Sequence, residues 1–329
     1  MVRVVRIMDI PSARSSHTRP VPKSGGLAIV VAFATGSLII YFVARYARIE
    51  DRYFWGFLIC GILLAAVSFF DDIFQKSFLI KLAAQVLCLL VMLAAGVVLS
   101  RLSLPFAGET ELGWSGYAIT AVWLLGLTNA YNFMDGLDGL AGGVALVAAI
   151  FLCVIALHER SLFVYLTSYV LIASVAGFLV FNFPVARIFM GDVGSAFLGF
   201  SFAALAVIGA QVDFARLSFY VVPLLLFHFI FDTSFTFVRR LMNSEPVHEA
   251  HRTHLYQLLN RTGFSHVAVC LYHCGMTVVQ GFGALVLVKL EPSERIYVFV
   301  PFFMYQALYA WWVLRRARAH GLLPHEHDV

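Results

Sequence analysis

Charged residues are scarce in this sequence: Asp, Glu, Lys and Arg make up 13% of its 329 residues, whereas 61% are hydrophobic. A soluble chain is about half apolar and roughly a quarter charged, so one water-soluble core cannot cover this much apolar surface. The same composition excludes a disordered chain, a collagen and a disulfide-rich secreted scaffold. The sequence therefore predicts an integral membrane protein with little mass outside the bilayer.

Further absences narrow the possibilities. No Cys-x-x-Cys pair occurs among the five cysteines, which lie in apolar runs, so we expect reduced and buried thiols. The basic start of the chain lacks the apolar stretch of a signal peptide. No basic face is visible, which argues against nucleic acid as a partner.

Apolar runs of membrane-spanning length recur along the whole chain. We expect about ten transmembrane helices, near residues 25–45, 53–70, 79–99, 115–128, 140–157, 162–182, 195–211, 217–238, 267–289 and 296–314. The fourth run is short, which indicates a tilted helix or one that continues through the polar segment after it. No linker divides the chain, so residues 1–329 are predicted to form a single all-α, polytopic membrane domain.

Lys and Arg residues are distributed unequally between the two sides of this predicted arrangement. Fifteen lie on the side that holds both termini and eight on the other. Because positive residues collect in cytoplasmic loops, both termini are predicted to be cytoplasmic. Most of the motifs that carry acids, amides or histidines lie on the same side, so we expect an active site on the cytoplasmic face.

Asp71 and Asp72 close the second predicted span, and Lys81 follows at the start of the third. Adjacent carboxylates at a membrane boundary repel each other, so a proton, a cation or a basic partner is expected beside them. Mg²⁺ suits such a pair because it combines one or two carboxylates with phosphate oxygens and water. The alternative is a solvated acid pair, with Lys81 extended toward the membrane interface.

The segment NAYNFMDGLDGLAGG carries four polar residues at three-residue intervals: Asn129, Asn132, Asp135 and Asp138. On a helix they would share one broad face, where their oxygens suit a cation or sugar hydroxyl groups. Capping of the fifth span by one of the aspartates is the structural alternative. That alternative leaves both asparagines without a role.

Three more segments on this side carry polar groups, and each has two explanations. Asp192 lies in GDVGS before an apolar helix, which predicts either a site for phosphate and its Mg²⁺ or a helix cap. His251, Arg252 and His254 form the sequence HRTH, which either faces a diphosphate or belongs to an interfacial loop. His17 is likewise part of an arm for an anionic ligand or of a basic membrane anchor.

Five stretches, in order, resemble the polyprenyl-phosphate N-acetylhexosamine-1-phosphate transferases of glycosyltransferase family 4. This family includes enzymes that start O-antigen and teichoic acid synthesis, and the phospho-N-acetylmuramoyl-pentapeptide translocase. The stretches are DIPSARSSHTRPVPKSGGLAI, DDIFQKSFLIK, NAYNFMDGLDGLAGG, FNFPVARIFMGDVGS and HRTHLYQLL.

This resemblance implies transfer of N-acetylhexosamine-1-phosphate from a UDP-sugar to undecaprenyl phosphate, with release of UMP. The product would start a cell-envelope glycan such as O-antigen lipopolysaccharide. The resemblance also implies Mg²⁺ as the cofactor, with Mn²⁺ as an alternative, and a location in the bacterial inner membrane. It leaves open whether the protein forms a homodimer.

The same resemblance assigns roles to individual residues. It makes Asp71, Asp72 and Lys81 catalytic, and Asp192 and Asn132 metal ligands. The remaining residues are implied to bind substrate, at the nucleotide and metal pocket or at the diphosphate and sugar: Asn129, Asp135, Asp138, His251, Arg252 and His254. It leaves open whether attack is direct or passes through an aspartyl intermediate.

Two features depart from the family pattern. Members usually carry a further span before the first stretch, so this chain is expected either to have ten spans instead of eleven or to lack its first one. The HRTH sequence differs from the HHH or HIHH of better-known members and is closer to an O-antigen branch. Donors of that branch include UDP-N-acetyl-fucosamine and UDP-N-acetyl-quinovosamine. The sequence therefore does not decide between these sugars and N-acetylglucosamine.

A secondary transporter of an anionic or sugar substrate is the alternative from another functional class. Transporters place ionisable residues near the bilayer midplane, often in broken helices. Here the acids lie at the ends of the predicted spans on one side, which favours the transferase.

Overall fold

The computed structural model describes residues 8–9, 20–43, 50–74, 78–211, 216–246 and 251–323. Most of these residues are helical. The helices are α1 (Gly25–Val43), α2 (Asp51–Phe74), α3 (Phe78–Ala94), α4 (Ser115–Phe133), α5 (Leu140–His158), α6 (Leu162–Asn182), α7 (Gly191–Gln211), α8 (Val221–Leu225), α9 (Phe227–Met242), α10 (Leu255–Arg261), α11 (His266–Leu287), the 3₁₀ turn η1 (Arg295–Val298) and α12 (Phe299–Ala319). Two antiparallel strand pairs join β1 (Met8–Asp9) to β2 (Val21–Pro22) and β3 (Arg101–Leu104) to β4 (Gly108–Glu111).

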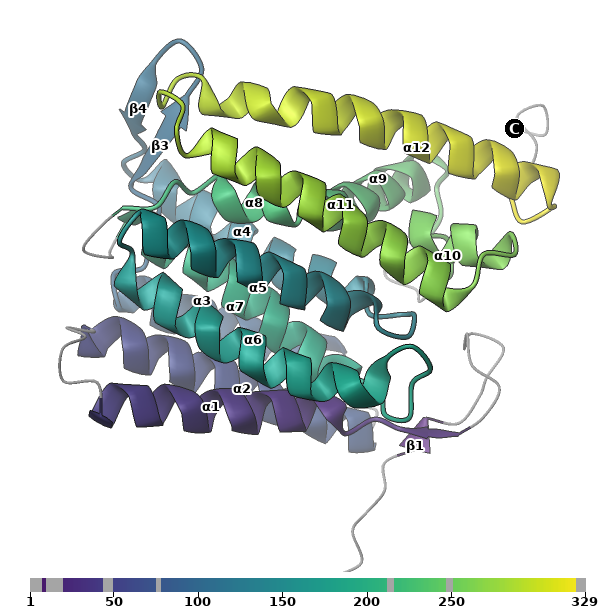
Figure 1. Ribbon diagram of the computed structural model, residues 1–329, viewed down its shortest axis with the longest axis horizontal. Coiled ribbons are helices and arrows are strands. Elements are labelled where there is room, and N and C mark those ends of the chain that lie inside the picture. Colours follow the sequence, from purple (N-terminus) through teal and green to yellow (C-terminus); the bar gives the residue numbers. More distant parts are fainter. Residues whose placement is uncertain are drawn as a thin grey trace, which may run out of the picture.

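The long helices lie side by side in one bundle (Figure 1), and α7 is its central member. The apolar part of α7 is buried throughout, and the helix packs against α1, α2 and α4. Small residues allow this close packing. A Cβ atom on Gly26 would lie 2.2 Å from the backbone nitrogen of Gly194, and one on Gly199 would lie 2.9 Å from the Thr128 Cα atom.

Seven helices of the described chain are long and apolar enough to cross a membrane, which supports a multi-pass membrane protein. They are α1, α2, α5, α6, α7, α11 and the continuous η1–α12 segment. The other three predicted spans do not meet this criterion. α3 has only 17 residues, and α4 continues through the polar Asn129 and Asn132 to Phe133. The count of ten spans therefore stays a prediction.

The predicted span 217–238 is wrong as a single helix. The chain breaks at Leu226 into the five-residue α8 and the longer α9. α9 is amphipathic, because His228, Asp232 and Thr236 are buried at four-residue spacing while Val238 is exposed. The apolar content of this stretch conceals the polar stripe, which explains the error.

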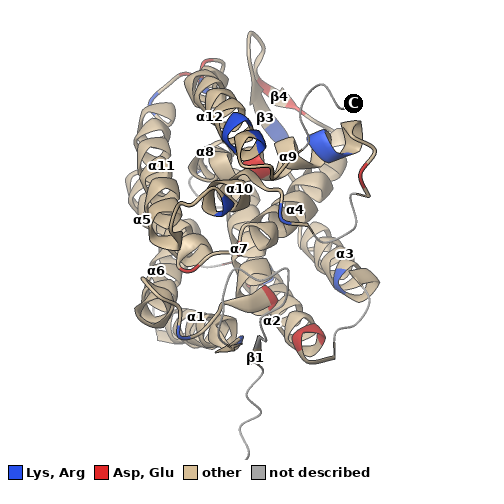
Figure 2. Ribbon diagram, turned by 90° about the vertical axis from the view of Figure 1, so that its right-hand side faces the viewer, with Lys and Arg blue, Asp and Glu red and all other residues tan. Residues whose placement is uncertain are grey.

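The bundle has two unlike ends. The first, which we call the acidic end, consists of residues 71–74, 78–81, 129–139, 183–195 and 251–256. The second, which we call the hairpin end, consists of the β3–β4 hairpin with residues 211, 216–220 and 290–298. The hairpin end lies on the left in Figure 1 and the acidic end on the right. Figure 2 looks onto the acidic end, where the ribbon is red at Asp or Glu residues of α2 and blue at Lys or Arg residues of α3, while most of the helices are uncharged.

Candidate active site at the acidic end

Lys81 joins two carboxylates that come from different helices. Its Nζ atom lies 2.6 Å from Asp71 Oδ2 and forms a second ion pair with Asp192 Oδ2. Asp71 lies in the last turn of α2, Lys81 in the first turn of α3 and Asp192 in the first turn of α7. The structure therefore brings together two motifs that are more than 100 residues apart, and the ammonium group offsets the repulsion between their carboxylates.

Asp72 faces the turn that begins α7. Gly191 has φ of 66°, and a Cβ atom on it would lie 3.1 Å from Asp72 Oδ2. Glycine therefore permits this turn and leaves room for the carboxylate. Asp72 Oδ2 and Asp71 Oδ1 are buried without a hydrogen-bond partner among the described residues. Buried oxygens of this kind are costly unless a further positive group satisfies them.

Asp135 adds another carboxylate, from the loop between α4 and α5. Burial, together with the negative charges of Asp192 and Asp72, raises the pKa of Asp135 to about 7. Lys23 opposes this effect. A divalent cation would relieve the repulsion among these carboxylates, and their hard oxygen atoms are the ligands that Mg²⁺ prefers. Carboxylate oxygens of this kind suit Mg²⁺ or Mn²⁺, although no group of three or more His, Cys, Asp or Glu side chains in the described part of the chain is spaced to hold a metal ion.

The two asparagines of α4 have different partners. Asn132 Nδ2 donates to Ser195 Oγ on α7 at 2.8 Å. Asn129 and Gln85 form a reciprocal amide pair, with N–O distances of 2.8 and 3.1 Å. Gln85 was missed by the sequence analysis, although it follows Lys81 by four residues on α3 and so shares its face.

A cavity of about 170 Å³ lies beside the Lys81–Asp192 ion pair. It opens between α2, α3, α4 and α7, and its polar lining consists of Ser68, Lys81, Gln85, Asn129, Asn132 and Asp192. Four of these six residues were predicted to be site residues. Cation, amide and carboxylate groups around one small cavity can hold a phosphate group together with its counter-ion.

Asp138 contacts a different part of the structure. Its Oδ2 atom accepts a hydrogen bond from the Ala186 backbone N–H at 3.1 Å, and its Oδ1 atom lies 3.4 Å from Nδ1 of His266. Asp138 thereby ties the α4–α5 loop to the α6–α7 loop and to the start of α11. Its role in substrate binding stays a prediction, and the His266 contact was not foreseen.

Asp232 of α9 holds the HRTH segment in place. This buried carboxylate accepts hydrogen bonds from the backbone N–H groups of Leu255 and Tyr256, at 2.9 and 3.0 Å, and lies 3.2 Å from His254 Nδ1. It therefore satisfies donors that α10 leaves free at its N-terminus. The Tyr256 hydroxyl group donates to the Phe133 carbonyl at 2.9 Å, which fixes α10 against α4.

His251 is neutral near pH 7. Burial lowers its pKa to about 4, with help from His254, Arg240 and Arg239. The Thr253 N–H donates to His251 Nδ1 at 3.3 Å, so the proton of the neutral ring lies on Nε2. His251 can therefore act as a hydrogen-bond donor through Nε2.

Phe133 connects the HRTH segment to the cavity. Its ring lies 6.0 Å from the ring of His254, and the residue also lines the 170 Å³ cavity. Arg252 is half-buried in the same segment. The predicted arm around His17 lies outside the described residues, which begin again at residue 20.

Substitution of Asp232 provides a test of this arrangement. We expect Asp232→Asn to speed amide hydrogen exchange in α10 by about tenfold or more, because an amide nitrogen cannot accept the bonds that the carboxylate accepts. Exchange in α7, which Asp232 does not contact, should stay unchanged as the internal control. Measurement by mass spectrometry that found equal exchange of α10 in both proteins would contradict the capping role.

Comparisons with known proteins agree with this geometry. Residues 54–210 match the family model described as glycosyl transferase family 4. This stretch contains Lys81, both asparagines of α4 and the four carboxylates Asp71, Asp72, Asp135 and Asp192. The probable undecaprenyl-phosphate N-acetylglucosaminyl 1-phosphate transferase of Bacillus subtilis (strain 168) is 35% identical over 262 residues, which are 79% of this chain and 71% of that protein.

Two other relatives extend the comparison. The decaprenyl-phosphate N-acetylglucosaminephosphotransferase of Mycobacterium leprae (strain TN) is 30% identical over 312 residues, which cover 86% of this chain and 77% of that protein. The phospho-N-acetylmuramoyl-pentapeptide-transferase of Latilactobacillus sakei subsp. sakei (strain 23K) is 34% identical over 198 residues, 57% of this chain and 61% of that protein. The chain therefore belongs to glycosyl transferase family 4 and is a phosphosugar transferase.

Proposed function

We propose that this protein transfers N-acetylhexosamine-1-phosphate from a UDP-sugar to undecaprenyl phosphate at the acidic end, releasing UMP and starting a cell-envelope glycan. One observation carries the proposal. The charged 170 Å³ cavity shares Asn129 and Phe133 with a much larger apolar groove. A polar site that opens into a membrane-facing apolar groove suits an acceptor with a phosphate at the end of a long hydrocarbon chain.

The apolar groove has a volume of about 860 Å³ and lies between α4 and α9. Ile119, Val122, Gly126, Ile230 and Phe237 are among the residues that line it. Each methylene group buried there contributes about 0.8 kcal/mol, so a polyprenyl chain is well suited to fill it. Its phosphate would then lie at the Asn129 and Phe133 end, beside Lys81.

The proposed cofactor is Mg²⁺ or Mn²⁺. Asp192 and Asn132 are its proposed ligands, and the unpartnered oxygens of Asp71 and Asp72 lie in the same cluster. When bound, the cation would neutralise the charge on the reacting phosphates.

The reaction breaks the bond between the sugar-bearing phosphorus and the oxygen that leaves with UMP. A new bond forms between that phosphorus and an oxygen of the acceptor phosphate. We propose that Lys81 contacts a phosphate, that Asp72 orients or deprotonates the acceptor, and that His251 donates to the diphosphate through Nε2. Arg252 and His254 complete the basic side of the site. The same bonds are broken and formed overall whether the acceptor attacks directly or the reaction passes through an aspartyl intermediate.

The names of two relatives point to N-acetylglucosamine as the first sugar to test. The excess of Lys and Arg on its side of the predicted arrangement supports a cytoplasmic position for the acidic end, and the resemblance to the family supports the bacterial inner membrane. Initiation of O-antigen synthesis remains the prediction that the HRTH sequence makes.

A panel of donors tests the proposed function. Purified protein would receive undecaprenyl phosphate, Mg²⁺ and, in separate reactions, the UDP derivatives of N-acetyl-glucosamine, -galactosamine, -fucosamine and -quinovosamine. We expect one donor to release UMP with a kcat/KM at least about tenfold above the others, since pockets that hydrogen-bond sugar hydroxyls discriminate well. Absence of UMP with every donor would contradict the proposal.

Filling the apolar groove should weaken binding of the acceptor. Gly126 lines the groove, and a Cβ atom on it would meet nothing within 4 Å, so a larger side chain enters the groove without a clash. We expect Gly126→Leu to raise the KM for undecaprenyl phosphate about tenfold and to leave the KM for the UDP-sugar unchanged. The effect should disappear with a short-chain prenyl phosphate.

Gly177→Leu is the matched control. Gly177 is an exposed glycine of α6 with the same open space around it, and it lies outside the groove. If both variants raised the KM for the acceptor equally, or if Gly126→Leu left it unchanged, the groove would not hold the prenyl chain.

A further inference from the structure

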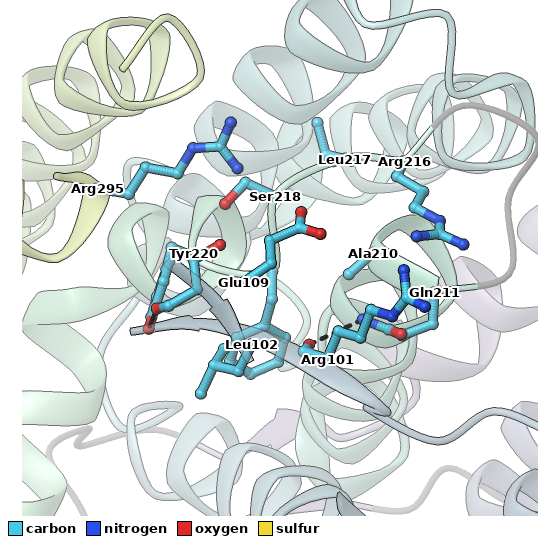
Figure 3. A pocket seen from close by; sticks show the side chains of 12 residues that line it. Arg101, Leu102, Glu109, Ala210, Gln211, Arg216, Leu217, Ser218, Tyr220 and Arg295 are labelled. Carbon is cyan, nitrogen blue, oxygen red and sulfur yellow. Dashed lines mark hydrogen bonds between the residues drawn. The ribbon is translucent and has the colours of Figure 1, made fainter. Parts of the chain in front are cut away.

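Three arginines from distant parts of the chain converge at the hairpin end of the bundle, opposite the proposed active site. Arg101 begins β3, Arg216 lies between α7 and α8, and Arg295 begins η1. All three line one cavity of about 50 Å³ (Figure 3). Of the eight Lys and Arg residues that the sequence assigns to this side, three therefore surround one small site instead of being scattered along the interface.

The surroundings hold these arginines in different ways. Arg101 Nη2 lies 3.1 Å from Glu111 Oε1, and the two residues are opposite each other in the β3–β4 register. Arg295 Nε donates to the Leu290 carbonyl at 3.2 Å. Arg216 is exposed, and Figure 3 shows its guanidinium group extending toward that of Arg101.

The balance of charge in the cavity is positive. Glu109 is the one acidic residue among the described residues that line it, against three arginines, of which Arg101 is already paired with Glu111. Guanidinium groups that approach each other repel unless an anion lies between them. Their planar arrays of N–H donors match phosphate oxygens in pairs, which makes phosphate the anion that this arrangement favours.

The cavity borders an apolar surface. Phe219 lines both this cavity and the groove between α4 and α9. A ligand with its phosphate among the arginines would therefore have a hydrocarbon surface close by. This neighbourhood favours a lipid over free phosphate.

We propose that Arg101, Arg216 and Arg295 bind the phosphate of an anionic phospholipid from the membrane leaflet at the hairpin end. One acyl chain of this lipid lies against Phe219, at the end of the groove remote from the acidic end of the bundle. The phosphate site lies at the opposite end of the bundle from the sugar-transfer chemistry, so its test does not depend on the proposed reaction, although the acyl chain and the proposed prenyl chain would share one groove.

Lipid retention on the purified full chain tests this site. Native mass spectrometry would compare binding of phosphatidylglycerol and phosphatidylcholine to the wild type and to the double variant Arg216→Gln/Arg295→Gln. We expect the wild type to retain phosphatidylglycerol in preference, and the double variant to lose this preference by about tenfold or more, because charge-assisted hydrogen bonds are removed. Arg216→Gln alone should give a smaller loss, and its exposed side chain makes misfolding a poor explanation.

Arg160→Gln is the matched control, because Arg160 is an exposed arginine of the α5–α6 loop at the same end and outside the cavity. We expect it to retain phosphatidylglycerol like the wild type. An equal loss in this control would indicate attraction by the general positive charge and would overturn the specific site. Unchanged retention in the double variant, or displacement of the lipid by equimolar inorganic phosphate, would also overturn the proposal. Thermal unfolding of each variant shows whether it is folded.

Discussion

Asp192→Asn is expected to lower kcat for UMP release by about 10³-fold, the order of effect seen when one group that stabilises transition-state charge is removed. Asp192 is paired with Lys81, and together they line the cavity that opens into the groove. The amide keeps the size of the side chain but loses the charge that a divalent cation and Lys81 both require. The measurement is the rate of UMP release at saturating donor and acceptor.

Asp51→Asn serves as the control for this substitution. Asp51 is an exposed acid at the start of α2, and its carboxylate accepts a hydrogen bond from the Tyr41 hydroxyl group at 2.6 Å. It lies at the other end of the bundle, so its loss should leave kcat within about twofold of the wild type. Mg²⁺ should raise the unfolding temperature of the wild type and of Asp51→Asn, because it binds the folded state, and should raise that of Asp192→Asn much less. A kcat for Asp192→Asn within tenfold of the wild type would remove Asp192 from the site.

Lys81→Met is expected to reduce both stability and activity. The substitution leaves the carboxylates of Asp71 and Asp192 without the ammonium group that lies between them. Breaking a fully buried ion pair costs about 3–5 kcal/mol, and the 26% exposure of the Lys81 side chain reduces this to about 1–3 kcal/mol. We expect kcat to fall by at least about 10²-fold, because Lys81 also contacts a phosphate in the proposed mechanism.

A double variant separates these two effects. Lys81→Met/Asp71→Asn removes one positive and one negative charge, so the unfolding free energy should recover toward the wild-type value while kcat stays low. Lys81→Arg keeps the charge but not the compact ammonium geometry, and should give an intermediate rate. Recovery of kcat in the double variant would show that Lys81 acts only by neutralising Asp71.

Much of the fold can be predicted from the apolar runs and from the polar or glycine-containing turns that separate them. The sixth predicted span, 162–182, coincides with α6, and the fifth differs from α5 by one residue. In both cases polar or glycine-containing turns bound a continuous apolar run. The break at Leu226 was missed because mean hydropathy does not reveal the four-residue spacing of polar residues in α9. The β3–β4 hairpin was missed because its strands are short and partly charged.

The motifs predicted which segments meet, but not how individual side chains pair. Asp71, Lys81 and Asp192 lie together, as a shared phosphate site requires. The amide pair of Gln85 with Asn129 could not be foreseen, because it joins residues 44 positions apart and depends on how α3 packs on α4. The capping role of Asp232 could not be foreseen for the same reason, since its partners lie 22 to 24 residues further along the chain.

The most direct test of the account follows both products of one reaction. Purified protein in sealed lipid vesicles would receive the preferred UDP-N-acetylhexosamine, undecaprenyl phosphate and Mg²⁺, and UMP and the lipid-linked diphosphate sugar would be quantified together. The account predicts equal amounts of the two products, and no turnover when EDTA removes the cation. Undiminished turnover in EDTA, or transport of the sugar into vesicles without UMP, would contradict it.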